Sequence, residues 1–594
     1  MSVFSRVVCA ALLFVVGCGG GPSGGGADAA LDGAATDGGD APDGAPRVDG
    51  AAEVDAALTP VDAALPAVDA AVADAAVADA TVADAQVADT ALADAAPDAP
   101  PATVTALRIS PRHPVLGAGE VARFRAIATL STGATVDVTA DAGWLSSDTI
   151  AATVSNSGAS KGEVTGGAQL PVTISAQYGA FTAMVSFEIN AWGGVPMARN
   201  VGSLALDGDD RGGLMAAFTS PTTAGGVGLN GVWLKGGFMD PEETIPTGTG
   251  DVETPELVLS DRGDRLASWV RDIGDRGARY LSGNGSLFNA TGWQAARSME
   301  MGSLVLGQPV LSVSRLGTGY AVWSEGGGSG GSYAARFTPA AGWDMVPTLV
   351  GSGVGRIAAT TSNGAVLVLA TSAGPAQPGH VRARRYVVGT GWTAVVDVDQ
   401  GDITSAWAEV AVDATGRAVA IWHHRVGTSH GLRAASMDAT GTWAAAVDVV
   451  APGPGGINFP KLAMNYAGDA VLAWQQGDAG VLSGWRARYS PSTGWSAPAT
   501  FEQSTGMIRG FSVAINGDGE IYNLWSELSG TTWRLLVNHE NPEIGLSEAI
   551  GLDTSTTGSF DELEIFSAVR GGAVAGYVKT RAGGQRDLNA LIFD

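Results

Sequence analysis

The stretch Glu409–Trp443, EVAVDATGRAVAIWHHRVGTSHGLRAASMDATGTW, carries the pattern that decides the fold. Short apolar runs alternate with glycine-containing turns, which is typical of antiparallel hairpins. The unit therefore predicts a four-stranded sheet. Its expected strands are Glu409–Val412, Ala418–Trp422, Leu432–Ser436 and Trp443–Val449, with a turn at Asp413–Gly416.

The same unit recurs about every 50 residues, and a fixed period of this length indicates a repeat architecture. In one register an aromatic residue follows a turn glycine: Gly212/Phe218, Gly263/Trp269, Gly317/Trp323, Gly416/Trp422, Gly468/Trp474, Gly519/Trp525 and Gly571/Tyr577. One further unit keeps Gly364 but has Ala370 at the aromatic position. A second register holds Trp192, Phe238, Trp293, Trp343, Trp392, Trp443, Trp495 and Leu546. Four-stranded units repeated in this way predict a β-propeller, with eight blades in residues 191–594.

The order of the two registers predicts how the ring closes. The second register starts first, at Trp192, whereas the last unit stops after its third strand, Leu588–Phe593. We therefore expect the N-terminal segment Ala191–Val201 to supply the missing fourth strand. Such pairing protects an edge strand that would otherwise be exposed.

Residues 103–190 predict a separate, smaller β-sandwich. Alternating runs such as Val172/Ile174/Ala176 are separated by glycine turns. The segments Asp137–Thr139, Trp144–Asp148 and Ala152–Ser155 resemble the bacterial Ig-like domain of group 2, although Gly166–Pro171 is bulkier than usual there. The resemblance implies a spacer or binding domain in which Trp144 belongs to the core.

The first 18 residues predict a lipoprotein signal. The apolar run Val7–Val16 is too short to span a bilayer and suits a signal-peptide core. Small residues before Cys18 resemble the lipobox of bacterial lipoproteins, which implies cleavage before Cys18 and its acylation. An ordinary secretory signal is the alternative. The resemblance implies an outer-membrane lipoprotein of the cell envelope, facing either the surface or the periplasm.

Residues 19–102 form a low-complexity stretch of Ala, Asp, Val, Pro and Gly. Aspartates recur at Asp69, Asp74, Asp79, Asp84, Asp89 and Asp94, a spacing that matches neither a helix nor a strand. With little to bury and a high negative charge, this stretch predicts a disordered tether. The alternative is an acidic tail that binds a partner.

Composition excludes several classes of protein. Of 594 residues 85 are glycine, which argues against a long helical or coiled-coil protein. The net charge of -26 argues against nucleic-acid partners, which require Lys/Arg patches. Both cysteines, Cys9 and Cys18, lie at the N-terminus, so no disulfide is expected in the folded part. We expect a monomer without a cofactor.

The loops between strands two and three, and between strand four and the next unit, are the variable ones. Variable loops on a rigid scaffold commonly carry function. Six polar residues follow the second strand there, and form the candidate ligand-binding face: Asp272, Glu325, His424, Gln476, Glu527 and Lys579. The alternative is that they are ordinary solvated loop residues.

Motifs for catalysis or metal binding are weak, and no catalytic or metal-binding residue is assigned. His423, His424 and His430 share one loop but fit no standard metal spacing. Asp207–Asp210 and Asn516–Glu520 resemble calcium loops in composition, but are better explained as hairpin turns. Ser436–Trp443 is similar to the sialidase Asp-box with one extra residue, and that box is a structural turn in the family.

The sequence therefore predicts a lipid-anchored surface protein with a propeller distantly similar to sialidase and kelch propellers. The expected role is non-catalytic binding of a carbohydrate, a peptide or another envelope component, so the protein is expected not to be an enzyme. One alternative is a propeller glycoside hydrolase of the sialidase type, which would need an acidic pocket with several arginines. Another is a scaffold for outer-membrane assembly. Fold alone does not choose between them.

Overall fold

The computed structural model describes residues 102–593 except 210, 224, 248–250, 261–262, 273–278, 287–292, 294–296, 299–308, 315, 326–330, 345, 352–356, 362–363, 371–378, 401–407, 478–481, 504–505 and 569–571. Strands make up almost all regular structure within these residues, with one 3-10 turn at Gly158–Ser160. They include no helix long and apolar enough to cross a membrane. The predicted signal peptide and nearly all of the predicted tether lie outside them.

The strands between Val104 and Asn190 form three small sheets around one core. Ile174 and Phe124 are completely buried in this core, and Trp144 is 4% exposed, as expected of a core tryptophan. The first sheet has β1 (Val104–Ser110), β4 (Arg125–Leu130) and β5 (Thr135–Asp137). The second has β2 (Leu116–Gly117), β10 (Phe181–Asn190), β9 (Pro171–Tyr178) and β6 (Gly143–Ser146), and the third β3 (Val121–Arg123), β8 (Glu163–Gly166) and β7 (Ala152–Val154).

From Leu204 to Phe593 the described residues form eight successive sheets, which we number sheet 1 to sheet 8. Sheet 1 contains β12 (Leu204–Gly208), β13 (Leu214–Pro221), β14 (Val227–Lys235), β15 (Phe238–Met239) and β16 (Glu243–Ile245). Sheet 2 contains β17 (Asp251–Leu259), β18 (Arg265–Asp272), β19 (Arg279–Ser286) and β20 (Arg297–Ser298). Sheet 3 contains β21 (Val310–Val313), β22 (Gly319–Glu325), β23 (Gly331–Thr338), β24 (Gly342–Trp343) and β25 (Thr348–Gly351).

The next sheets repeat this order. Sheet 4 contains β26 (Ile357–Thr361), β27 (Gly364–Ala370), β28 (Val381–Val387), β29 (Gly391–Trp392) and β30 (Val396–Asp397). Sheet 5 contains β31 (Ala408–Val412), β32 (Ala418–Val426), β33 (Ser429–Met437) and β34 (Val447–Gly453). Sheet 6 contains β35 (Gly456–Met464), β36 (Ala470–Gly477), β37 (Ser483–Ser490), β38 (Gly494–Trp495) and β39 (Ala499–Thr500).

The last two sheets include the junction of the chain's two ends. Sheet 7 contains β40 (Met507–Ile515), β41 (Ile521–Ser529), β42 (Thr532–Asn541), β43 (Gly545–Leu546) and β44 (Ile550–Ser555). Sheet 8 contains β45 (Phe560–Ser567), β46 (Ala573–Thr580), β47 (Arg586–Phe593) and β11 (Trp192–Arg199). In sheet 8, β11 runs antiparallel to β47 with Trp192 opposite Phe593, and these two rings stack with centroids 4.9 Å apart.

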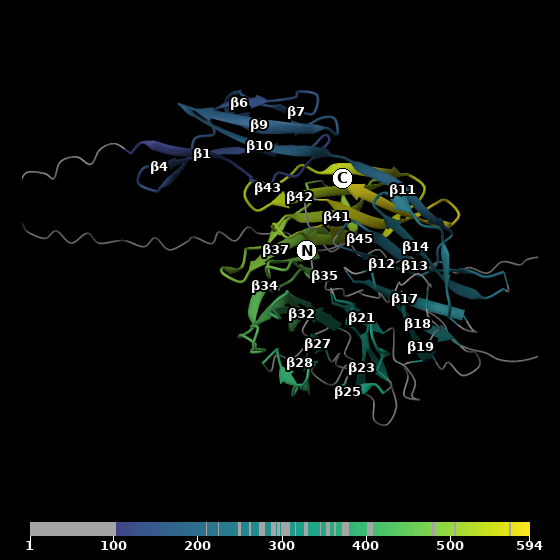
Figure 1. Ribbon diagram of the computed structural model, residues 1–594. Helices are drawn as coiled ribbons and strands as arrows, with labels where there is room; N and C mark the ends of the chain where they lie inside the picture. Colours follow the sequence, from purple (N-terminus) through teal and green to yellow (C-terminus); the bar gives the residue numbers. More distant parts are fainter. Residues whose placement is uncertain are drawn as a thin grey trace, which may run out of the picture. The chain divides into compact units, whose positions relative to one another are not determined.

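The first strands of the eight sheets contact one another in a closed cycle. In chain order β12, β17, β21, β26, β31, β35, β40 and β45 each contact the next, and β45 contacts β12 (Figure 1). Side chains join neighbouring first strands at several points. The Leu462 amide donates to Glu409 Oε2 at 2.7 Å, and the Ile565 amide donates to Ser512 Oγ at 3.2 Å. Burial of Glu409 raises its pKa to about 8.

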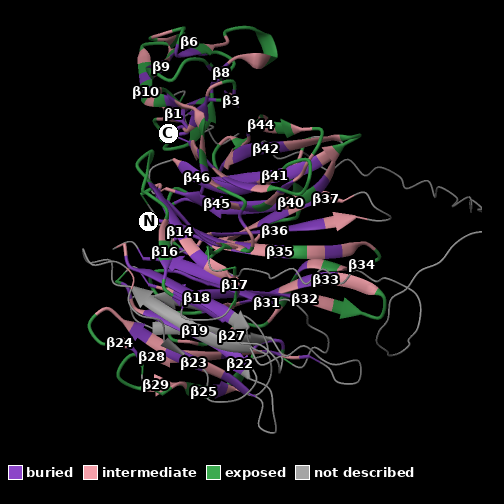
Figure 2. Ribbon diagram, turned by 90° about the vertical axis from the view of Figure 1, so that its right-hand side faces the viewer, coloured by how far each residue is buried: buried purple, intermediate pink, exposed green. Residues whose placement is uncertain are grey.

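The core of this repeated region lies between the sheets. The aromatic residue that follows the turn glycine is buried in the second strand: Trp269, Trp323, Trp422, Trp474 and Trp525 are at most 1% exposed. Figure 2 shows the second strands β36 and β41 largely in the colour of buried residues. Side chains two apart on a strand share a face, so each of these strands presents a continuous apolar face to a neighbouring sheet.

Each sheet has two ends, which we name for their connections. The turn face carries the turns between strands one and two and between strands three and four. The loop face carries the loops between strands two and three and from strand four to the next sheet. On the turn face, Asn516 Oδ1 accepts the amides of Asp518 and Glu520 at 3.0 and 2.9 Å. Asp209 similarly caps its own turn, accepting the Gly213 amide at 2.6 Å. Both segments therefore act as hairpin turns.

Candidate functional site

The six residues of the predicted ligand-binding face occupy equivalent places, at the loop-face ends of second strands. Asp272 and Glu325 end β18 and β22, and their side chains lie outside the described structure. His424 is half-buried in β32. Gln476, in β36, accepts a hydrogen bond from Trp474 Nε1 at 3.0 Å. Each of these residues belongs to a different sheet.

Lys579 and Glu527 are engaged in the seams between adjacent sheets. Lys579 Nζ, in sheet 8, forms an ion pair with Asp553 Oδ2 of sheet 7 at 2.8 Å. Glu527 is completely buried and forms an ion pair with Arg534, the residue opposite it on β42. Trp525 Nε1 lies 3.4 Å from Glu527 Oε2.

A second carboxylate, Glu502, lies in the same seam as Glu527. It follows β39 on the loop from sheet 6 to sheet 7, is half-buried, and accepts the Gly484 amide at 2.9 Å. Burial raises the pKa of Glu502, and the negative charge of Glu527 raises it further. Glycine provides the necessary room: a Cβ at Gly506 would lie 2.8 Å from Glu527 Cδ. The seam therefore holds a half-buried carboxyl group whose protonated form is favoured by burial.

The position of Glu502 repeats along the chain, and this is the signal that the sequence analysis missed. Asp399, Glu502 and Asp553 stand seven residues after Trp392, Trp495 and Leu546 respectively. Asp399 Oδ2 accepts the Val381 amide at 2.9 Å, as Glu502 accepts that of Gly484. These acids therefore share a local role at the start of the third strand. What distinguishes Glu502 is the carboxylate that faces it from the next sheet.

A histidine pair occupies the loop face of sheet 5. His423 Nε2 lies 2.9 Å from His430 Nδ1, and His423 is 7% exposed. Burial, together with the neighbouring His430, lowers the pKa of His423 to about 4, so its ring is neutral near pH 7. Within the described residues there is no group of three or more His, Cys, Asp or Glu that would hold a metal ion.

Comparison with known proteins was made at the level of both sequence and structure. No family model matches the chain. A 76-residue stretch is 37% identical to Ice-binding protein 1 of Shewanella frigidimarina, covering 13% of this chain and 8% of that protein. The chain thus spans less than a tenth of the length of this curated relative.

Three solved structures illustrate the structural likeness. An ulvan lyase of a polysaccharide lyase family has a TM-score of 0.39 at 11% identity, over 66% of this chain and 95% of that one. A protein of unknown function from Dyadobacter fermentans has a TM-score of 0.35 at 12% identity, over 59% and 96%. A neuraminidase-like protein of subtype N11 from a flat-faced bat virus has a TM-score of 0.28 at 11% identity, over 48% and 86%. The neighbours are propeller-like folds.

These findings correct one prediction. The expectation that the protein is not an enzyme is contradicted, since the similar structures include a polysaccharide lyase and a neuraminidase-like protein. From the sequence a propeller glycoside hydrolase was only the alternative, because a sequence does not show which carboxyl groups converge. At identities of 11–12% no residue role is transferred from these proteins, and the site is argued from the contacts above.

Proposed function

We propose that this protein is a carbohydrate-active enzyme that hydrolyses glycosidic bonds, with Glu502 as its proton donor. The observation that carries the proposal is the half-buried carboxyl group of Glu502 in the seam between sheets 6 and 7. Glycoside hydrolysis requires one carboxyl that donates a proton and a second that is charged. Burial raises the pKa of Glu502 and so favours the protonated form that a proton donor needs.

Each residue has a distinct part in this proposal. Glu502 is half-buried and donates its proton to the leaving glycosidic oxygen. Glu527 is completely buried, so it is a positioning residue that keeps Glu502 protonated and does not itself touch the substrate. Arg534 forms an ion pair with Glu527. Glycoside hydrolysis also uses a second carboxylate within about 10 Å of the first. Asp272 and Glu325 belong to sheets 2 and 3, across the cycle of first strands from sheets 6 and 7, so they are not candidates for that carboxylate.

We further propose the architecture and location in which this site operates. The closed cycle of first strands supports an eight-bladed propeller, and the sheets from Val104 to Asn190 support an Ig-like sandwich. The lipobox-like segment supports acylation at Cys18 and a place in the bacterial cell envelope, with the Asp-rich segment as spacer. The substrate would then be an extracellular or periplasmic glycan.

The test compares Glu502→Gln with Asp399→Asn, a matched variant at the equivalent position of sheet 4. Turnover is measured with a panel of fluorogenic aryl glycosides and sialosides that differ in leaving-group acidity. Glu502→Gln should lower turnover by about 10²–10⁴-fold, the usual contribution of a general acid. The loss should be largest for poor leaving groups, because these depend most on protonation. Asp399→Asn should retain activity, since Asp399 faces His380 at 3.2 Å.

Two results would count against the proposal. One is equal turnover by the unchanged protein and Glu502→Gln on every substrate in the panel. The other is an equal loss on good and poor leaving groups, which would indicate a structural role for Glu502. Products should also be checked for an unsaturated uronate by ultraviolet absorbance. An unsaturated uronate would show that the protein cleaves by elimination instead of hydrolysis. His423, which is neutral near pH 7, would then be the candidate base.

A further inference from the structure

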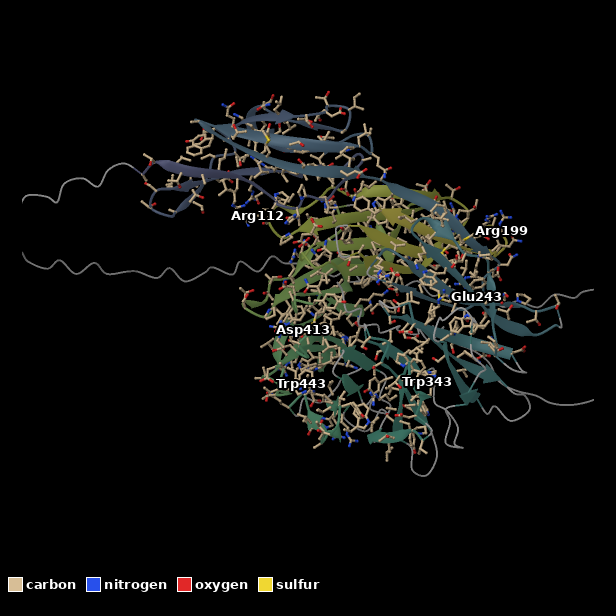
Figure 3. All side chains as sticks on the ribbon, viewed as in Figure 1. Arg112, Arg199, Glu243, Trp343, Asp413 and Trp443 are labelled. Carbon is tan, nitrogen blue, oxygen red and sulfur yellow. The ribbon has the colours of Figure 1, made fainter. Side chains whose placement is uncertain are left out.

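A cavity of about 350 Å³ lies between sheets 5 and 6 on the turn face, away from the loop-face carboxylates. We call it the 5/6 pocket. It is lined by Arg417, Ala418, Val419, Ser436, Met437, Asp438, Thr442, Trp443, Ala444, Met464, Gly468, Tyr489 and Pro491. Figure 3 labels Trp443 and Asp413, which belong to this part of sheet 5. One wall is the segment Ser436–Trp443, the Asp-box-like turn noted in the sequence.

The neighbouring seams show why a cavity exists here. In three other sheets the residue seven before the strand-four tryptophan is an arginine that crosses to the next sheet: Arg336, Arg385 and Arg488. The Arg336 guanidinium lies 5.5 Å from the Tyr386 ring centroid. Arg385 Nη1 donates to the Ala439 carbonyl oxygen at 3.0 Å. Arg488 reaches the Gly519 carbonyl oxygen and lies 3.3 Å from Glu540 Oε1.

Sheet 5 has Ser436 at this position, seven residues before Trp443. Across the seam, Tyr489 corresponds to Tyr386, and Gly468 corresponds to Gly519. The receiving surface of sheet 6 is therefore retained, while position 436 carries only a hydroxymethyl group. The crossing to sheet 6 is made instead from the turn by Arg417, whose Nη2 donates to the Ala467 carbonyl oxygen beside Gly468 at 2.7 Å. The 5/6 pocket is lined by Ser436, Gly468 and Tyr489 together with Arg417.

The lining combines aromatic rings with charged groups. Trp443 and Tyr489 are half-buried, so each presents part of its ring to the pocket. Arg417 is held in place by Asp413, with Nε 2.6 Å from Asp413 Oδ2, and its Nη2 donates to the Ala467 carbonyl oxygen at 2.7 Å. Asp438 accepts the Thr440 hydroxyl at 2.6 Å, which keeps the pKa of Asp438 below its usual range and the carboxylate charged.

This chemistry suits one class of ligand. A pyranose ring has apolar C–H faces that pack on aromatic rings, and hydroxyls that hydrogen-bond to carboxylate and guanidinium groups. The cavity is within the usual size range of small-ligand pockets. Arg417, Ser436 and Asp438 provide both donors and an acceptor next to the two rings.

We propose that the 5/6 pocket is a second carbohydrate-binding site, which holds one sugar unit of a glycan against Trp443 and Tyr489. The choice of a sugar rests on the proposed function, whereas the existence of the pocket does not. A binding site on the turn face would hold a polymeric substrate at a point separate from the Glu502 carboxyl. Binding and turnover are then carried by different residues.

The test measures binding to the purified full chain of cello-, chito- and galacturono-oligosaccharides, by intrinsic tryptophan fluorescence and saturation-transfer NMR. The decisive variant is Ser436→Arg, which restores the arginine found in neighbouring seams. It should weaken binding at least about tenfold while the protein remains folded, because the arginine occupies the pocket. Trp443→Ala should weaken binding by about fivefold, since stacking of one ring is worth about 1 kcal/mol.

Matched controls separate the pocket from general effects. Ala445→Arg adds the same charge to an exposed residue of sheet 5 that does not line the pocket. Trp392→Ala removes the equivalent, half-buried tryptophan of sheet 4, also outside the lining. Both should leave the Kd within about twofold, because neither residue lines the pocket. Absence of saturable binding to any probe, or equal binding by Ser436→Arg and the unchanged protein, would overturn the inference.

The test of the 5/6 pocket can fail or succeed independently of the test of the proposed hydrolase. If Glu502→Gln abolishes turnover but Ser436→Arg binds normally, the hydrolase stands and the second site is wrong. If no turnover is found but oligosaccharide binding is lost in Ser436→Arg, the second site stands and the proposed hydrolase is wrong.

Discussion

The seams on either side of sheet 7 use the same two positions for opposite purposes. In the seam between sheets 7 and 8, Asp553 faces Lys579, and their 2.8 Å ion pair satisfies both charges. In the seam between sheets 6 and 7, the equivalent residues are Glu502 and Glu527. Burial raises the pKa of Glu502 there, and the negative charge of Glu527 adds to the rise. The two seams thus form a natural comparison: an ion pair occupies one, and two carboxyl groups occupy the other.

The largest expected effect is on the free energy of unfolding, when a buried tryptophan of sheet 7 is truncated. Trp525 is completely buried, so Trp525→Ala should lower the free energy of unfolding by about 3–5 kcal/mol. The neighbouring Trp533 is half-buried, and Trp533→Ala should cost less. Urea unfolding followed by circular dichroism would measure both. Equal losses would contradict the view that the second strands hold the sheets together.

The Glu527→Gln variant tests whether the charge of Glu527 contributes to the raised pKa of Glu502. In Glu527→Gln the pKa of Glu502 falls, because the nearby negative charge is gone. The proton is then lost at lower pH, so the alkaline limb of the pH–rate profile should move toward acid. Turnover at neutral pH should fall, because a smaller fraction of Glu502 then carries the proton. An unshifted alkaline limb would show that Glu527 does not tune Glu502.

Removing the Lys579 ammonium group from the seam between sheets 7 and 8 should change the free energy of unfolding but not turnover. Lys579→Met deletes the ion pair with Asp553 and should cost about 1 kcal/mol of unfolding free energy, because both side chains are partly exposed. Turnover should be unchanged, in contrast to Glu502→Gln. Thermal unfolding and the fluorogenic assay would be run on the same preparation. A loss of turnover in Lys579→Met would extend the active region to sheet 8.

The smallest effect at neutral pH is expected from His423. Its pKa is lowered to about 4 in the folded protein, against an ordinary value of 6.5. The unfolded chain therefore binds a proton first on acidification, and stability should be lost as pH falls from 6.5 toward 4. Urea unfolding at several pH values would measure this slope. In His423→Gln it should be shallower, whereas His424→Gln, at the half-buried neighbour, should retain it.

Much of the repeated fold was accessible from sequence because its signals are local. A turn glycine fixes a hairpin, and strand alternation then assigns the face of the aromatic residue that follows, as in Trp422, Trp474 and Trp525. The all-β character follows from the same local pattern. The sequence placed the predicted ligand-binding residues at one end of the sheets. It did not show which residues they contact. Gln476 bonds to Trp474 in its own strand, and Lys579 reaches another sheet.

The sequence by itself located most strands of the repeated unit, because strand alternation depends on neighbours within a few positions. The predicted fourth strand, Trp443–Val449, was wrong in its bounds, since β34 spans Val447–Gly453 and Trp443 forms only an isolated bridge with Met437. Only the tertiary structure decided which residues meet across a seam. Glu502 and Glu527 are ordinary glutamates in the sequence, and Ser436 is an ordinary serine. The shifted pKa of Glu502 and the cavity beside Ser436 arise because sheets from successive repeats pack against each other. That packing is a property of pairs of repeats, which no single repeat encodes.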